Sequence, residues 1–198
     1  MLSYYEYILY LMEHKQEYYL KSLQTENSAM LRTALVYSLQ RFRLLIGEEN
    51  IPAVLMQTLE QNEGCDTSMI QDAIVAAENV RAFAQAKYSN FRVGSALLCS
   101  DSSIVVGTNV ESSSYGLTIC AERSALTSAL SAGKTGIDVV VVCTDTDVPS
   151  SPCGACRQLL FDYAPESLVI MRNLNGDEQI VFTKHLLPFG FSDNQLMK

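Results

Sequence analysis

Basic side chains are scarce in this 198-residue chain. Fourteen Lys and Arg stand against twenty-two Asp and Glu, which gives a formal net charge of -8 at pH 7 with neutral His. Proteins that grip the phosphates of DNA or RNA need charge of the opposite sign. We therefore expect no nucleic acid polymer among the partners of this protein.

Long apolar runs are also missing. No stretch approaches the roughly 18 apolar residues that a membrane-spanning helix needs. Glu6, Glu13 and Glu17 lie where a signal peptide would have a basic start and an uninterrupted apolar core. We therefore expect no membrane association and a cytoplasmic location.

Hydrophobic residues nevertheless make up 48% of the chain and charged residues only 18%. This composition supplies enough apolar material for a packed core and argues against global disorder. The length fits one domain, or one domain with an appendage.

Residues 1–67 have the pattern of a helical N-terminal extension. Apolar and aromatic side chains recur at helical spacing in two stripes, which consist of Tyr4, Tyr7, Ile8 and Leu11 and of Leu31, Leu35, Leu39 and Phe42. Six of the ten tyrosines fall within the first nineteen residues. These helices either dock on the main domain or on a partner, or simply pack against one another.

Residues 68–198 alternate between helical and β-rich patterns. Three helical segments are predicted. The first begins at Ser68 and has an apolar stripe that extends to Ala84, and the other two are Cys120–Ala132 and Cys153–Tyr163. Five β-rich runs lie between and after them, at Val93–Cys99, Ile104–Gly107, Asp138–Cys143, Leu168–Met171 and Gln179–Phe182. Helices interleaved with strands predict an α/β fold, a three-layer α/β/α sandwich around a mixed five-stranded sheet.

Six cysteines are present, and in a cytosolic chain of this size metal binding or catalysis is more typical of them than disulfides. Cys120 and the pair Cys153 and Cys156 each lie where a helix is predicted to begin. A C-x-x-C pair alone fits a redox site, half of a zinc site or chance. The Cys-Ala-Glu sequence at 120–122 favours zinc, because helix N-termini stabilise thiolates and could bring three of them together.

Three protein ligands leave the fourth tetrahedral position of Zn²⁺ free for water, which is typical of a catalytic site. Glu122 lies two residues after Cys120 and can exchange protons with that water. A structural four-ligand site would need one more Cys or His. The other candidates lie outside both clusters, namely Cys65, Cys99, Cys143, His14 and His185, and Cys99 and Cys143 are expected to be buried in strands.

With these residues in hand, the chain resembles the small homo-oligomeric cytidine deaminases from about Ser68 to its C-terminus. Five ordered blocks carry the resemblance: YSNFRVG at 88–94, NVE at 109–111, SYGLTICAER at 114–123, SPCGACRQ at 151–158, and Leu186-Leu187-Pro188 with Phe191. The resemblance implies one zinc ion per chain, held by Cys120, Cys153 and Cys156. It also implies that Glu122 protonates N3 of cytosine while water attacks C4 and ammonia leaves.

The same resemblance assigns the substrate contacts. Asn109 and Glu111 would bind the ribose hydroxyls, and Ala121 would line the substrate site. Phe91, and Phe191 from a neighbouring subunit, would pack on the pyrimidine, while Tyr115 would approach the 5' end of the sugar across a subunit boundary. Active sites at interfaces imply a homotetramer or a homodimer.

Arginines next to the cysteines are candidates for tuning the charge of three thiolates around zinc. Arg123 is the stronger candidate. Arg157 is the weaker one, and as a surface residue of a helix it needs no role.

The leading hypothesis is therefore a zinc hydrolase that converts cytidine and deoxycytidine to uridine and deoxyuridine in pyrimidine salvage. The alternatives are a deaminase of another cytosine-containing small molecule, such as a nucleoside antibiotic, and a non-catalytic scaffold or regulatory homologue. Deamination within DNA or RNA fits the acidic composition less well. Glu122 argues against the scaffold, because a purely structural zinc site has no need of a carboxylate beside a ligand.

Overall fold

The computed structural model describes residues 33–34, 36–41, 67–192 and 195, and the chain divides into two compact units, Met1–Thr67 and Ser68–Lys198. In the first unit, residues 33–34 and 36–41 are helical and Leu39 is buried. The stripe at residues 4–11, together with Leu31, Leu35 and Phe42, lies outside the described residues. The all-helical extension thus stays a prediction.

The second unit is built on one mixed five-stranded sheet with the strand order β2-β1-β3-β4-β5. The strands are β1 (Gly94–Cys99), β2 (Ile104–Thr108), β3 (Ile137–Thr144), β4 (Leu168–Asn173) and β5 (Glu178–Phe182). Only the β3–β4 pair is parallel, and the other three neighbouring pairs are antiparallel. The prediction of a mixed sheet is confirmed.

The central strands are buried on both faces. Every residue of β1 and of β3 is buried, including the four consecutive valines 139–142 of β3. A continuous run of β-branched residues suits such a strand, because neither of its faces meets water. The layers that cover these faces consist of helices.

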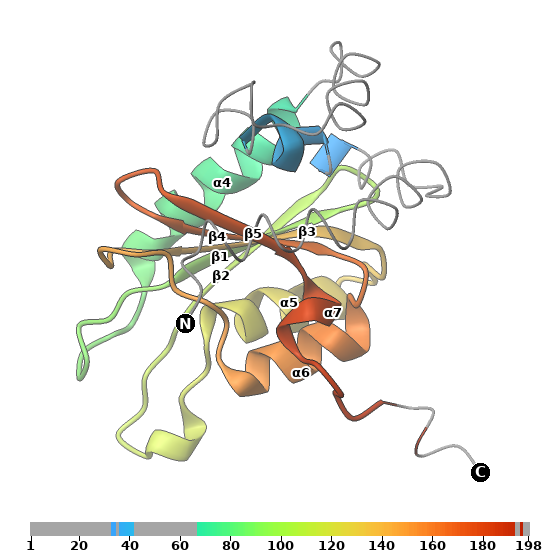
Figure 1. Ribbon diagram of the computed structural model, residues 1–198. Coiled ribbons are helices and arrows are strands. Elements are labelled where there is room, and N and C mark those ends of the chain that lie inside the picture. Colours follow the sequence, from blue (N-terminus) through green and yellow to red (C-terminus); the bar gives the residue numbers. More distant parts are fainter. Residues whose placement is uncertain (1–32, 35, 42–66, 193–194, 196–198) are drawn as a thin grey trace. The chain divides into compact units, whose positions relative to one another are not determined.

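Helix α4 (Ser68–Val80) covers one face of the sheet, while α5 (Ala121–Ser131), α6 (Gly154–Tyr163) and the short α7 (Thr183–Leu186) lie on the other (Figure 1). Side chains of α5 and α6 join one apolar core with strands β1, β3 and β4, which includes Leu126, Leu160, Leu97, Val140 and Met171. The predicted three-layer sandwich is confirmed. In the part of the chain that the structure describes, no helix has the length and apolarity that crossing a membrane requires.

Two glycines allow the helices to approach the sheet closely. A Cβ atom at Gly107 in β2 would lie 2.3 Å from the backbone nitrogen of Ala125 and 2.6 Å from the carbonyl oxygen of Ala121. On the opposite face, a Cβ atom at Gly94 would lie 2.0 Å from the carbonyl oxygen of Ala77. Helix α5, which carries the Cys-Ala-Glu sequence at its start, is therefore seated directly on the backbone of β2.

Helix α4 is shorter than the apolar stripe from Ser68 to Ala84 predicts. It ends at Val80, a 3-10 turn follows at Arg81–Phe83, and Ala84 is buried but extended. The inclusion of Ala84 in the helix is therefore wrong. The backbone leaves the helix because Gln85 pairs with a distant segment: its N–H donates to the carbonyl of Asn109, and its carbonyl accepts from the N–H of Glu111.

Candidate active site

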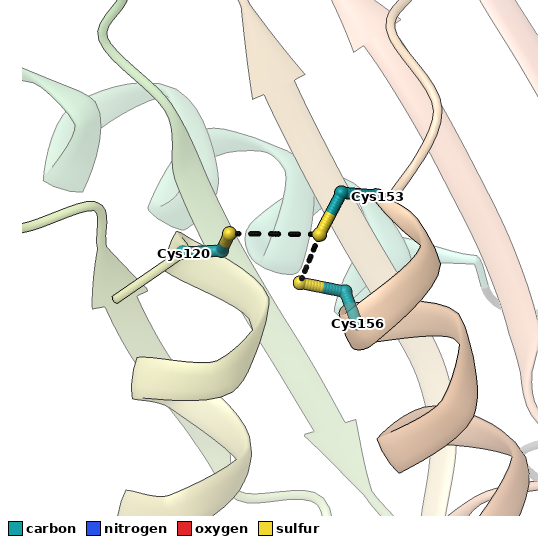
Figure 2. A group of neighbouring side chains, drawn as sticks. All are labelled: Cys120, Cys153 and Cys156. Carbon is teal, nitrogen blue, oxygen red and sulfur yellow. Dashed lines mark hydrogen bonds between the residues drawn. The ribbon is translucent and has the colours of Figure 1, made fainter. Parts of the chain in front are cut away.

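The three predicted cysteine ligands converge at two neighbouring helix starts. Cys120 is the N-cap of α5, Cys153 is the N-cap of α6, and Cys156 lies in the first turn of α6 (Figure 2). Both N-cap residues have extended backbone, with ψ angles of 156° and 166°. Each helix therefore presents its unpaired N–H groups and its positive dipole end toward the sulfurs.

The spacing of the sulfurs fits a tetrahedral zinc ion. The Sγ atom of Cys153 lies 3.7 Å from that of Cys120 and 3.5 Å from that of Cys156, and all three atoms lie within 4.8 Å of one another. Zn–S bonds of about 2.3 Å at tetrahedral angles place neighbouring sulfurs about 3.8 Å apart. The three side chains can thus ligate one zinc ion with little rearrangement.

Charge is distributed unevenly over the sulfurs even without a metal. Hydrogen bonding with Cys156, followed by that with Cys153 and Arg123, lowers the pKa of the Cys120 thiol to about 5 against the opposing effect of burial. The same hydrogen bond with Cys120, together with burial, raises the pKa of Cys156. Cys120 therefore becomes a thiolate more readily than Cys156.

Arg123 lies beside this thiolate. Its Nη2 donates a hydrogen bond of 2.8 Å to the carbonyl of Thr118 and lies 3.9 Å from the Sγ of Cys120. Burial opposes the charge of the guanidinium, but the hydrogen bond to Cys120 and the three nearby sulfurs raise the pKa of Arg123 overall. The positive guanidinium thus lies close enough to the sulfurs to offset part of their negative charge.

Glu122 is a buried carboxyl group in the first turn of α5, with only 4% of its surface exposed. Burial is the main cause that raises its pKa, the charge of Cys120 adds to the effect, and hydrogen bonding with Cys156 opposes it. A raised pKa makes a carboxyl group easier to protonate than one in water. This is the property that a proton shuttle needs.

A second group of predicted site residues surrounds the segment 88–93. The Asn109 amide accepts a 2.9 Å hydrogen bond from the N–H of Val93 and donates one of 2.8 Å to the carbonyl of Phe91. The Glu111 carboxylate accepts from the N–H groups of Tyr88, at 2.7 Å, and of Ser89, at 3.2 Å. Both side chains therefore bond to the backbone of the segment 88–93 before any ligand binds.

Binding capacity remains on both of these side chains. The Ser89 hydroxyl also donates to Glu111, and this bond is the leading cause that lowers the pKa of the Glu111 carboxyl. An ionised carboxylate offers about four acceptor positions, and an amide has two N–H groups and two lone pairs. Glu111 and Asn109 can thus still form hydrogen bonds with a ligand group, such as a hydroxyl, that both donates and accepts.

Backbone pairing connects this second group to the cysteines. The N–H groups of Val110 and Ile119 each donate to the other residue's carbonyl, at 2.9 and 3.0 Å. Because Ile119 directly precedes Cys120, the segment that carries Asn109 and Glu111 runs beside the entrance to α5. The predicted ribose contacts and the predicted metal ligands therefore belong to adjoining segments.

The remaining predicted contacts differ in exposure. Ala121 is fully buried, whereas Phe91, Tyr115 and Phe191 are 41%, 78% and 53% exposed. The ring of Tyr115 packs edge-on against Tyr88, with 6.2 Å between the centroids. The structure thus presents these three aromatic side chains at the surface of the chain.

Cys99 and Cys143 are buried free thiols in β1 and β3, which confirms their expected place. Burial raises the pKa of both thiols, that of Cys143 to about 11, so neither readily forms a thiolate. His185 lies in α7, where its ring packs edge-on against Phe182. Cys65 and His14 lie outside the described residues.

Two residues have contacts that the sequence did not indicate. Ser89 holds Glu111 through its hydroxyl and its N–H group. Arg157 is partly buried and makes three side-chain hydrogen bonds, so it is more than an ordinary surface residue of its helix. In the sequence, only the location of Ser89 and Arg157 inside the blocks that carry the family resemblance pointed to a role for them.

Comparison with known proteins agrees with this geometry. Residues 67–172 match the family described as cytidine and deoxycytidylate deaminase zinc-binding region. Cytidine deaminase of Halalkalibacterium halodurans is 44% identical over 125 residues, which cover 63% of this chain and 92% of that protein. Cytidine deaminase of Sporosarcina psychrophila is 40% identical over 128 residues, or 64% and 94% of the two chains.

A solved structure shows the same relationship. The crystal structure of cytidine deaminase from Burkholderia pseudomallei superimposes with a TM-score of 0.60 at 43% identity, and the match covers 61% of this chain and 98% of that one. The cluster of three thiols lies within the region that matches the zinc-binding family. From the fold, the metal centre and these similarities together, this chain belongs to the cytidine and deoxycytidylate deaminase family.

Proposed function

We propose that this protein deaminates cytidine and deoxycytidine hydrolytically, yielding uridine and deoxyuridine with release of ammonia. The observation that carries the proposal is the convergence of three sulfurs at zinc spacing beside the buried carboxyl of Glu122. The relatives that are 40–44% identical are named cytidine deaminase, which supports cytidine as the substrate over a nucleoside antibiotic or a scaffold role.

The residues divide the chemistry between them. Cys120, Cys153 and Cys156 would hold the zinc ion, which supplies a Lewis acid that makes water nucleophilic near neutral pH. Glu122 would take a proton from that water and deliver it to N3 of cytosine. It would then move the second proton, from the hydroxyl now on C4, to the 4-amino group, which leaves as ammonia. Oxygen from water ends on C4, so atoms and charge balance.

The substrate is proposed to lie between the metal and the segment 88–93. Asn109 and Glu111 would bind the ribose hydroxyls with the capacity that their internal hydrogen bonds leave open. Ala121, Phe91, Tyr115 and the neighbouring subunit's copy of Phe191 would surround the base and the sugar. Arg123 would reduce the negative charge of the three thiolates, so that the metal keeps its Lewis acidity.

Replacement of Glu122 by Gln tests the proton shuttle. We expect zinc to stay bound at one ion per chain while kcat for cytidine falls by about 10²- to 10⁴-fold, the usual contribution of general acid and base catalysis. Loss of absorbance by cytidine gives the rate, and metal analysis gives the occupancy. Glu166→Gln is the control, since Glu166 makes a surface ion pair with Lys184 and should be replaceable at little cost.

Absence of turnover by zinc-loaded wild-type protein would contradict the proposal as a whole. Retention of most activity in Glu122→Gln would contradict only the assigned shuttle. Ammonia release from a panel of cytosine nucleosides identifies the preferred substrate.

Assembly as a homotetramer or homodimer with sites at the interfaces is part of the same proposal. The exposure of Tyr115 and Phe191, at 78% and 53%, supports it, because the family resemblance assigns both side chains to contacts across a subunit boundary. Light scattering that gave the mass of one chain would contradict it.

A role in cytoplasmic pyrimidine salvage completes the proposal. Its support is the clustering of three thiols at metal-ligand spacing, since thiols stay available to a metal in a reducing compartment. Residues 1–67 would form a separate helical extension that docks on the core or on a partner.

A further inference from the structure

Arg157 lies in α6 directly after Cys156, and its guanidinium joins two segments that are far apart in the sequence. Its Nε donates to the carbonyl of Pro152 at 2.8 Å, and its Nη2 donates to the Ser151 hydroxyl at 2.6 Å. Its Nη1 donates to the carbonyl of Leu186 at 3.1 Å. One side chain thus holds the loop before α6 and the end of α7.

The first two acceptors belong to the loop that leads into Cys153. Residues 151–153 have no regular secondary structure, and Cys153 is the exposed member of the three sulfurs. Packing therefore fixes Cys153 less than it fixes the buried Cys156. The Arg157 side chain folds back from the first turn of α6 and bonds to the two residues directly before Cys153. These bonds hold the backbone that positions the Cys153 sulfur.

The third acceptor connects the metal ligands to the C-terminal segment. The next residue, Gln158, donates from its Nε2 to the carbonyl of Phe191 at 2.9 Å. Helix α6 therefore carries one sulfur at its N-cap and another in its first turn, and it holds the segment 186–191 at two points. A displacement of this helix start moves both Cys153 and the backbone of Phe191.

The acceptors of Arg157 are oxygens of neutral groups, two carbonyls and one hydroxyl, which indicates a geometric role. The planar guanidinium offers five N–H donors in a fixed fork, so it can hold three acceptors in one arrangement. A lysine at this position has a single rotatable ammonium group and cannot reproduce that arrangement.

We infer that Arg157 is a positioning residue, which fixes Cys153 for the metal and ties the metal loop to the C-terminal segment that carries Phe191. The part of this inference that concerns substrate rests on the proposed function, whereas the part that concerns the metal does not. Residues that orient metal ligands typically change metal affinity about 10- to 100-fold when they are replaced.

The test compares zinc release and kinetics in the full zinc-loaded chain. A chromogenic chelator measures the rate of zinc release. In Arg157→Met we expect release about tenfold faster than in the wild type, together with a higher KM for cytidine. Arg157→Lys should restore neither property fully.

Two further variants separate the two connections. Ser151→Ala removes an acceptor in the metal loop only, so we expect faster zinc release with an unchanged KM. Gln158→Leu removes the bond to Phe191, along with an exposed bond to Asp162 within α6, so we expect a higher KM with unchanged zinc release. A general loss of stability would not produce this split.

Arg172→Met is the matched control for loss of a structural arginine. Arg172 makes ion pairs with Glu78 of α4 and with Glu178 of β5, on the face of the sheet opposite α6. We expect it to lower the melting temperature without changing zinc release.

Wild-type zinc release in Arg157→Met, or equally fast release in Arg172→Met, would overturn the inference. If Arg157→Met does not fold, the split between Ser151→Ala and Gln158→Leu decides. Failure of wild-type protein to turn over cytidine would refute the proposed function and leave the zinc-release comparison intact.

Discussion

The side-chain amide of Asn109 fastens the segment that leads into β1. It is 93% removed from solvent, since only 7% of its surface is exposed, and both of its polar atoms bond to the backbone of residues 91 and 93. Its replacement therefore affects folding as well as the proposed binding of ribose. The family resemblance had assigned this side chain only a contact with the ribose.

We predict that Asn109→Ala lowers the free energy of unfolding by about 1–3 kcal/mol, because the buried N–H of Val93 and the carbonyl of Phe91 lose their partner. Urea denaturation measures the change. Gln85→Ala is the control: Gln85 is exposed and bonds only the carbonyl of Phe83 through its side chain, so its loss should cost less than about 0.5 kcal/mol. Equal stability of the Asn109 variant and the wild type would contradict the prediction.

Residue identities were predictable where spacing alone determines the chemistry. The positions of Cys120, Cys153 and Cys156 at helix starts predicted their convergence, and Glu122 followed from its place beside a ligand. The contacts of Arg157 and Ser89 were not predictable in this way. Their partners are backbone groups of irregular loops, whose path no local sequence pattern reveals.

At the scale of elements, the strands were predicted to within two residues at each end, and both cysteine-bearing helices lie where expected. Each of these helices begins one residue later than predicted, because its cysteine caps the helix from an extended conformation. The end of α4 was missed for a different reason. The apolar stripe continues to Ala84, but the pairing of Gln85 with residues 109–111 takes the backbone out of the helix.

We predict that Gly107→Ala disturbs the start of α5. The added Cβ would meet backbone atoms of Ala121 and Ala125 at 2.6 Å or less, and backbone cannot give way as a flexible side chain can. Such overpacking typically costs about 1–3 kcal/mol, and here it also displaces Cys120. Denaturation together with zinc affinity measures both effects.

Gly94→Ala makes the matching comparison on the α4 face. We expect a similar loss of stability with unchanged zinc affinity. Weaker zinc binding in both variants would show that the effect is not local to α5.

The hairpin between β1 and β2 gives a pH-dependent prediction. Hydrogen bonds from Lys134 and then from Ser103 hold the pKa of Asp101 well below its ordinary value. A lowered pKa means that the stabilisation is fully present above the ordinary Asp value of about 3.9 and is lost as the pH falls toward the lowered pKa. The melting temperature of Asp101→Asn should thus lie below that of the wild type at pH 7, and the difference should shrink below pH 4.

At the scale of the whole molecule, zinc would join two helices that belong to different parts of the chain. We predict that chelation lowers the melting temperature by about 5–10 °C, since a ligand at 100 times its dissociation constant stabilises by about 2.7 kcal/mol. Differential scanning calorimetry measures the shift. A Cys153→Ser variant should respond to the chelator less than the wild type does.

We also predict that a chain lacking residues 1–66 keeps zinc and cytidine turnover. Every predicted ligand and substrate contact lies between residues 91 and 191, inside the compact unit Ser68–Lys198. Metal analysis and the cytidine assay test this, and light scattering shows whether the extension affects assembly. Loss of zinc on deletion would show that the extension supports the site.

The location of the sulfurs on α5 and α6 has a consequence for the order of folding events. The chain between Cys120 and Cys153 passes through β3, the middle strand of the sheet. In an unfolded chain Cys153 and Cys156 meet a metal most readily, because the loop between them is short, and Cys120 takes its place beside them once β3 lies between β1 and β4. During refolding with Co²⁺, the absorbance of a three-sulfur complex should therefore rise no earlier than the signal of sheet formation.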